Sequence, residues 1–128
     1  MMQIHPYIHF NGRCREAMTF YKESLGAELE MAPAEEGGRI VHASLVKDDL
    51  LLMGSDMQGP GAFARGNGIS LSLSCGSEAD IRLFFRRLST GGTVVSAVMA
   101  QQWGGLFGVV TDRFGITWML SYDAQARL

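Results

Sequence analysis

The residues with the clearest chemical potential lie near the start of the chain, where His5 and His9 flank Tyr7. Alternate residues of a β-strand face the same side, so these three would form one polar row. Imidazole can donate, accept or change charge near neutral pH, which suits hydrogen bonding or acid–base contact with a ligand. The alternative is that these histidines are structural, partly exposed or satisfied within the core. His5 and His9 would lie about 13 Å apart, too far to share one metal unaided.

Other candidate ligand-lining residues lie in later apolar stretches. His42 alternates with Ser44 and could reach the same cavity, or be satisfied within the core. Trp103 stands among glutamines and glycines, a composition that suits an aromatic flap over a ligand better than a packed strand. Three further residues would supply a soft wall, with core packing by the methionines as the alternative: Met53, Thr117 and Met119.

The two cysteines, Cys14 and Cys75, do not form a Cys-x-x-Cys pair. We therefore expect neither a zinc site nor a disulfide, and both thiols are expected to be reduced. Cys75 lies in an apolar alternation and is expected to act as a small buried hydrophobe. Cys14 lies near a predicted helix start, where a thiol pKa can fall, but no nearby His or Lys supports a nucleophile.

The composition limits the class of protein. The chain has 128 residues, 47% of them apolar, which suits one core rather than two large domains. Its net charge of −2 gives no excess positive potential for nucleic acid. There is no basic stretch followed by an apolar run at the start and no apolar window near the roughly 18 residues that span a bilayer. We expect no nucleic-acid or membrane partner and a cytoplasmic location.

The pattern of the first half, which would position these residues, predicts a strand, a helix and three strands. The helix would run over Arg13–Leu25 and end at Gly26. Turn residues at 35–38 and 47–49 separate the later apolar runs. The four predicted strands cover residues 4–10, 27–32, 39–46 and 50–53.

The second half repeats this plan. Phe20-Tyr21 aligns with Phe84-Phe85 at a shift of 64 residues, half the chain, which indicates an internal duplication. Ser77 can cap a second helix that stops at Gly91-Gly92, and residues 112–115 form the last turn. The predicted strands cover residues 69–75, 93–99, 106–111 and 116–121.

The pattern predicts an α+β fold of two tandem βαβββ modules, which form a curved, cup-shaped mixed sheet with one main helix per module. Module one covers about residues 1–56, a glycine-rich connector 57–67, and module two about 68–124, within a single domain 1–128. One helix covers one face of each sheet, and the other face would receive a ligand. Trp118 is expected to face the helix layer.

Several segments carry a family resemblance. These are His5–Ala17 with Phe20-Tyr21, Leu52–Asp56, Trp103-Gly104 and Phe107–Trp118. Together they resemble the PhnB-like branch of the glyoxalase/bleomycin-resistance/extradiol-dioxygenase (vicinal oxygen chelate) superfamily. The resemblance covers nearly the whole chain, and it implies a fold and a branch but no substrate, because this scaffold hosts unrelated chemistries.

The resemblance also implies four metal-ligand positions, a His or Gln at the start of each module's first strand and a Glu in each last strand. In this sequence they read His5, Met53, Gly68 and Met119. Only His5 suits a divalent ion, and shifting either methionine by one residue brings in no carboxylate. Asp56 and Asp112 fall in turns beyond these strand positions. We therefore expect no metal cofactor, although a divalent metal is the alternative.

Three functions follow from the resemblance. The first is a PhnB-like protein that binds a small molecule without the usual metal centre. The others are a divalent-metal-dependent lyase, isomerase or dioxygenase, in which His5 with His9 or His42 recruits the ion, and a drug-sequestering protein of the bleomycin-resistance kind. Related domains usually pair, so a homodimer is expected, and its partner could complete the ligand cup.

Overall fold

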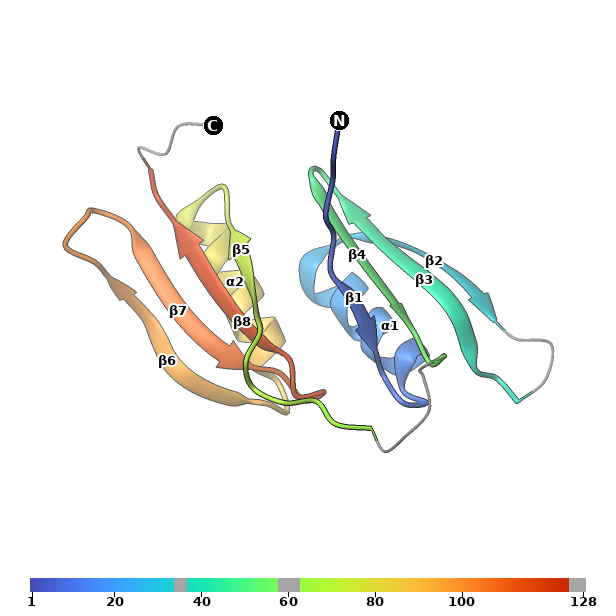
Figure 1. Cartoon of the computed structure of the whole chain (residues 1–128). Coiled ribbons are helices and arrows are strands. Elements are labelled where there is room, and N and C mark those ends of the chain that lie inside the picture. Colours follow the sequence, from blue (N-terminus) through green and yellow to red (C-terminus); the bar gives the residue numbers. More distant parts are fainter. Residues whose placement is uncertain (34–36, 58–62, 125–128) are drawn as a thin grey trace. The chain divides into compact units, whose positions relative to one another are not determined.

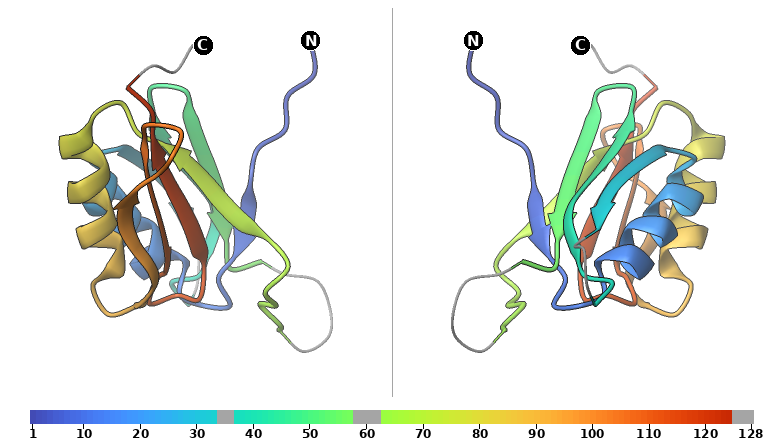
Figure 2. Two further views of the ribbon diagram at one scale, coloured as in Figure 1. Left: turned by 90° about the vertical axis from the view of Figure 1, so that its left-hand side faces the viewer. Right: turned by 90° about the vertical axis from the view of Figure 1, so that its right-hand side faces the viewer.

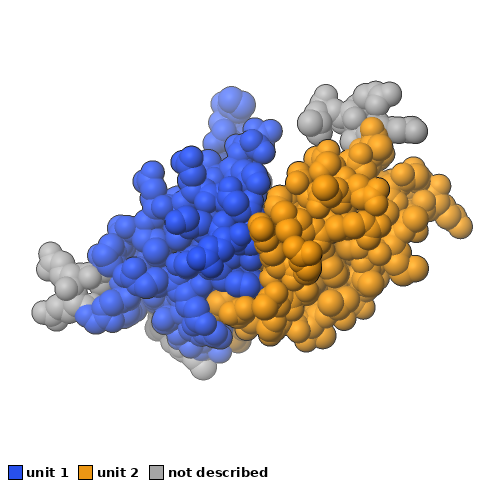
Figure 3. Space-filling model, turned by 180° about the vertical axis from the view of Figure 1, so that it is seen from behind, with its two compact units in different colours: residues 1–63 blue, residues 64–128 orange. Residues whose placement is uncertain are grey.

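The computed structural model describes residues 1–33, 37–57 and 63–124. The chain divides into two compact units, Met1–Phe63 and Ala64–Leu128 (Figure 3). Each unit contains one helix and one four-stranded sheet (Figure 1). The predicted α+β fold with two βαβββ modules is therefore confirmed, while the closure of the two sheets into a cup stays a prediction.

Module one has the strand order β1-β4-β3-β2. Strand β1 runs parallel to β4, and the other neighbours are antiparallel. The parallel pair follows from the connection, because α1 and two more strands separate β1 from β4 in the chain. The elements are β1 (Tyr7–His9), α1 (Cys14–Leu25), β2 (Glu28–Pro33), β3 (Ile40–Lys47) and β4 (Leu50–Ser55).

Helix α1 packs on one face of this sheet through a buried stripe (Figure 2). Its apolar residues recur three or four positions apart, as a one-sided helix requires. Gly26 ends the helix in the left-handed conformation at φ 67°, which glycine adopts without a steric penalty. The buried stripe consists of Cys14, Ala17, Met18, Tyr21, Ser24 and Leu25.

Module two repeats this arrangement with the order β5-β8-β7-β6. Helix α2 starts 64 residues after α1, so the predicted repeat is confirmed. Ser77 caps α2, as predicted, because its hydroxyl accepts a hydrogen bond from the Asp80 N–H at 3.0 Å. The elements are β5 (Ser70–Ser74), α2 (Glu78–Ser89), β6 (Thr93–Ala100), β7 (Leu106–Thr111) and β8 (Thr117–Tyr122).

The first strand is shorter than predicted. The sequence suggested Ile4–Phe10, but β1 pairs only over Tyr7–His9. Pro6 has no N–H and contributes only its carbonyl, which accepts from Met53 N at 3.1 Å, while Ile4 is almost fully exposed. The other elements begin and end within two residues of their predicted bounds.

Other predictions have mixed outcomes. Trp118 is buried, 2% exposed, beside the helix layer as predicted. Cys75 is only half-buried, whereas Cys14 is fully buried, and neither cysteine forms a disulfide within the described residues. The predicted turn residues Glu35 and Glu36 and residues 58–62 of the glycine-rich connector lie outside the described residues. Neither described helix is long and apolar enough to cross a membrane.

Candidate functional site

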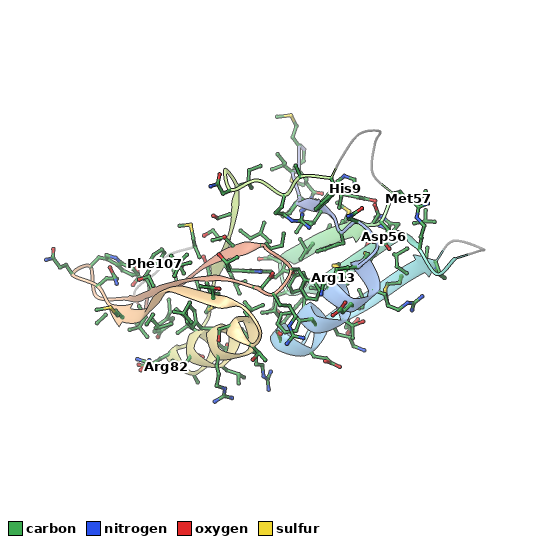
Figure 4. All side chains as sticks on the ribbon, turned by 90° about the horizontal axis from the view of Figure 1, so that it is seen from below. His9, Arg13, Asp56, Met57, Arg82 and Phe107 are labelled. Carbon is green, nitrogen blue, oxygen red and sulfur yellow. The ribbon has the colours of Figure 1, made fainter. Side chains whose placement is uncertain are left out.

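The two sheet faces that point away from the helices carry most of the candidate site residues. In module one, Ile8 and Phe10 are buried on the α1 side, whereas Tyr7 and His9, which alternate with them, are exposed on the other side. Figure 4 shows His9 on the side of the strands opposite α1. We call this surface the far face of module one. The predicted sharing of one face by Tyr7 and His9 is therefore seen in the structure.

The strand register brings distant residues together on this far face. Tyr7 lies opposite Met53, which lies opposite Ser44 on its other side. Directly opposed residues share a sheet face, so Tyr7, Met53 and Ser44 form a row across three strands. A register shift between Ala32 and Pro33 leaves Val41 out of the β2–β3 ladder.

Three aromatic rings meet on the far face. The Tyr7 ring centroid lies 5.4 Å from that of His9 and 5.7 Å from that of His42, with tilted planes. The Tyr7 hydroxyl lies 3.3 Å from His42 Nδ1, and His42 Nε2 lies 3.0 Å from Ser44 Oγ. We call this set, Tyr7, His9, His42 and Ser44, the ring cluster. Tyr7 is 42% exposed, so a ligand can reach its ring.

The hydrogen bonding within the ring cluster adapts to either neutral form of His42. Each hydroxyl can donate or accept, so whichever ring nitrogen carries the proton has an acceptor and the other has a donor. Both ring nitrogens of His42 are thus engaged, and the imidazole holds the Tyr7 hydroxyl in place. The cluster offers a ligand an exposed aromatic face and a fixed hydroxyl.

The remaining predicted residues lie on different parts of the fold. His5 is half-buried but precedes β1, so it is outside the paired strand. Met119 lies opposite Ser72 on the corresponding far face of module two, and Thr117 shares that face. The Thr117 and Thr111 hydroxyls are 2.8 Å apart. Trp103, 52% exposed, stands in the β6–β7 turn, and its action as a flap stays a prediction.

The Trp103 ring rests against Gly105. A Cβ at position 105 would lie within 1.8 Å of the ring, so only glycine leaves room for it. In the turn formed by Gln-Gln-Trp-Gly-Gly, the absence of a side chain at Gly105 therefore leaves space for the Trp103 ring. Trp103 is nevertheless 52% exposed, so much of its side chain can be reached by a ligand.

Two buried carboxylates, Asp56 and Asp112, accept hydrogen bonds from backbone N–H groups and do not line the far faces. Asp56 accepts hydrogen bonds from the backbone N–H groups of Gly12, Cys14 and Ile40 at 2.8–3.0 Å. It therefore fixes the start of α1 to the ends of β3 and β4. Both residues were predicted only as turn residues, and Asp at such a position was the sequence signal for this backbone-binding role.

Asp112 has the same kind of role in the β7–β8 turn. It accepts from Phe114 N and Ile116 N through Oδ1, and from Trp118 Nε1 through Oδ2 at 2.9 Å. The residue is 3% exposed, so its charge is compensated by directed N–H groups. Bound in this way, the carboxylate is a structural anchor.

Cys14 is not poised as a nucleophile. Burial, reinforced by the negative charge of Asp56, raises the pKa of its thiol from 9.0 to about 12. The thiol is therefore protonated at neutral pH, and the helix start does not lower its pKa as such a position can. This burial agrees with the sequence-based expectation that Cys14 is not a nucleophile.

Comparison with known proteins identifies the family. The family model described as Glyoxalase/Bleomycin resistance protein/Dioxygenase superfamily matches residues 3–120. The chain belongs to this superfamily, as its sequence resemblance predicted.

Individual relatives agree with this membership and with the PhnB-like resemblance. The chain is 27% identical to protein YjdN of Escherichia coli over 97% of both chains. It is similar to the crystal structure of protein PA1353 from Pseudomonas aeruginosa, with 37% identity, a TM-score of 0.84 and coverage of 96% and 98% of the two chains. The structure of a PhnB protein from Bacillus cereus matches its fold with a TM-score of 0.81 at 22% identity, over 95% of this chain and 100% of the other.

The residues at the family's metal positions do not fit a hard divalent ion. The first strand of each module ends in the same way, because Phe10 N–H donates to the Ser55 carbonyl and Cys75 N–H donates to the Ser121 carbonyl. Met53 and Met119, two residues before these serines, are therefore equivalent, and so are their partners Tyr7 and Ser72. The residue two before Ser72, Ser70, then corresponds to His5, and it replaces Gly68 as the fourth position. One imidazole, two thioethers and one hydroxyl are a poor donor set for such metals. Within the described parts of the chain, no three His, Cys, Asp or Glu side chains gather as a metal site.

Proposed function

We propose that this protein binds a small, partly apolar molecule on the far face of module one, without the metal centre usual in its superfamily. The observation that carries this proposal is the hydrogen-bonded chain Tyr7–His42–Ser44, at 3.3 and 3.0 Å, beneath an exposed aromatic ring. A histidine with a purely structural role would need only hydrogen-bond partners for its two ring nitrogens. Here the same network also presents a tyrosine ring and hydroxyl outward.

The chemistry of the surrounding residues supports a binding role. Met53 lies beside Tyr7 in the same row and is half-buried, so its flexible thioether can adapt to a ligand's shape. His9 adds a second imidazole against the Tyr7 ring. Flat molecules gain both dispersion contact and ring–ring interaction on such a surface.

In this proposal, other predicted residues act as secondary lining. His5 would extend the imidazole row at its half-buried position. In module two, Met119 and Thr117 would give that module's own far face a thioether and a hydroxyl. Trp103 would act as the flap. These contributions are proposed from residue chemistry, and each is tested by its own alanine variant.

The first experiment is a thermal-shift screen of small fragments against the wild type, Tyr7→Ala and His42→Ala. Tyr122→Ala is a matched control, because this tyrosine lies on the helix-facing side of β8 in module two. A ligand at 100 times its Kd adds about 2.7 kcal/mol of stability, which raises Tm by several degrees. Hits should keep their shift in the control and lose most of it in Tyr7→Ala. Hits that bind Tyr7→Ala as well as wild type would contradict the site.

Metal content and turnover separate this function from its alternatives. Elemental analysis of protein purified without chelator, before and after incubation with Mn, Fe, Ni and Zn, should show no stoichiometric metal. A bound stoichiometric metal that His5→Ala removes would instead support the lyase or dioxygenase reading. A ligand that binds and is recovered unchanged would favour sequestration, whereas a product would identify an enzyme.

A further inference from the structure

The charge distribution around the far face of module one restricts the class of ligand. This inference rests on the proposed function, because it concerns the ligand of that same site. Residues 1–63 contain five Lys and Arg against nine Asp and Glu, so this half has a net charge of −4 with His neutral. The half that carries the ring cluster therefore has an acidic surplus.

Four of the five cations of module one lie at the helix or its ends. Arg13 precedes α1 and pairs with Glu16 at 3.2 Å, and the Lys47 ammonium donates to the Leu25 carbonyl at the end of α1. Arg15 and Lys22 are exposed residues of α1 itself. Because α1 covers the opposite face of the sheet, these charges are separated from the ring cluster by the sheet.

The fifth cation, Arg39, precedes β3, and its guanidinium donates to the Asp56 carbonyl at 3.3 Å. The full charges on the far face itself are instead negative. Glu30 lies opposite Ser44, and Glu28 opposite Val46, so both side chains share the face of the ring cluster. Both are exposed.

Among the described residues of module two, none of the strands β5 to β8 contains Lys or Arg. The arginines of this module lie on α2, at the β7–β8 turn, or beside Gly115 of that turn, as Arg65 does. Figure 4 shows Arg82 and Phe107 on opposite sides of this sheet. The far-face residues of β5, β7 and β8 are instead hydroxyl-bearing or apolar: Ser70, Ser72, Ser74, Phe107, Val109, Thr111, Thr117, Met119 and Ser121.

We infer that the ligand of the far face has no net negative charge: it is a neutral or protonated-amine molecule with a flat apolar part, and neither a phosphate nor a free carboxylate. The apolar part lies on the Tyr7 ring, its polar groups bond the Tyr7 hydroxyl, and any positive charge points toward Glu30. An anionic group in the same place would find no fixed cation on the face and two carboxylates at its edge. Repulsion between the anionic group of the ligand and these two carboxylates would weaken its binding.

Matched fragment sets test this inference. Each set has one aromatic scaffold with three end groups, such as 2-naphthoate, 2-naphthamide and 2-naphthylmethylamine, and Kd is measured on wild type and Tyr7→Ala. Tyr7-dependent binding should favour the amide and amine over the carboxylate by about tenfold. Glu30→Gln should narrow the gap between amine and carboxylate, and added salt should narrow it too.

Three results would overturn the inference, and they differ in what they say about the site. Tyr7-dependent binding that favours the carboxylates would refute the charge preference and leave the binding site standing. Loss of carboxylate binding in Arg39→Gln would show that this arginine supplies the missing cation. Absence of Tyr7-dependent binding in every charge class would refute the proposed site itself, and the charge preference with it.

Discussion

The anchor between Asp112 and the indole of Trp118 gives the sharpest test of how module two is held together. The carboxylate is 3% exposed and accepts from Trp118 Nε1 at 2.9 Å, while its other oxygen accepts from two backbone N–H groups. In Asp112→Asn, the amide oxygen can keep the two backbone bonds. Its NH₂ group must then face the indole N–H, donor against donor.

The expected cost follows from this geometry. A buried hydrogen bond to a charged group contributes about 1.5–3 kcal/mol, and an unsatisfied buried donor costs about as much. Asp112→Asn should therefore lower the free energy of unfolding by about 2–3 kcal/mol. Because Trp118→Phe removes the same donor, the two substitutions should couple by about 1.5–3 kcal/mol in a double-mutant cycle.

Urea unfolding of the wild type, both single variants and the double variant measures this coupling. Circular dichroism should report the transition in all four proteins, since Trp118→Phe removes a fluorophore. With a urea m-value of about 1–3 kcal/mol/M, the Asp112→Asn midpoint should fall by about 1 M. Additive effects, with coupling below about 0.5 kcal/mol, would refute the hydrogen bond as a source of stability.

Three further predictions concern other described residues. Folding raises the pKa of the Cys14 thiol from 9.0 to about 12, so the folded state favours the protonated thiol. The contribution of this thiol to the free energy of unfolding is therefore fully present below pH 9 and is lost as the pH rises toward 12. In Cys14→Ala, the free energy of unfolding should decline less over this pH range. In the wild type, thiol reagents should modify Cys75 well before Cys14, and equal modification rates would contradict the burial of Cys14. Gly54→Ala should lower the free energy of unfolding by about 1–3 kcal/mol, because its Cβ would lie 2.8 Å from the buried Phe10 ring. Gly68→Ala is the control, since it has open space and should lower the same free energy by less than about 0.5 kcal/mol. Similar losses of Tm in both variants would contradict the packing around Gly54. Ser77→Ala should lower stability by about 1 kcal/mol in urea unfolding, and an unchanged midpoint would show that the α2 cap is dispensable.

The sequence predicted the fold well because each local signal agrees with the tertiary arrangement. Both helices end where small residues follow, and both bury the stripe that their spacing indicates. The duplication was visible in the aromatic pairs Phe20-Tyr21 and Phe84-Phe85. The first strand was overestimated because alternation continues through Ile4 and His5, whereas ladder pairing starts only after Pro6.

The candidate site was predictable only in part. Period-2 alternation predicted that Tyr7 and His9 share a face, but the contact between Tyr7 and His42 spans 35 residues and depends on strand order. The order β1-β4-β3 leaves only β4 between the strands of Tyr7 and His42, and this brings His42 within reach of Tyr7. The backbone-binding roles of Asp56 and Asp112 likewise depend on turns whose geometry is set by distant strands.

The central claim is that a ligand binds on the far face of module one beside Met53, and methionine methyl NMR tests it most directly. The protein would be labelled at its methionine methyl groups and titrated with the strongest fragment from the screen. Our account predicts a saturable shift of the Met53 methyl signal that is absent in Tyr7→Ala. The signal of Met18, on the buried side of α1, should stay unchanged. Saturable binding that leaves Met53 unmoved and shifts methionines elsewhere would contradict it.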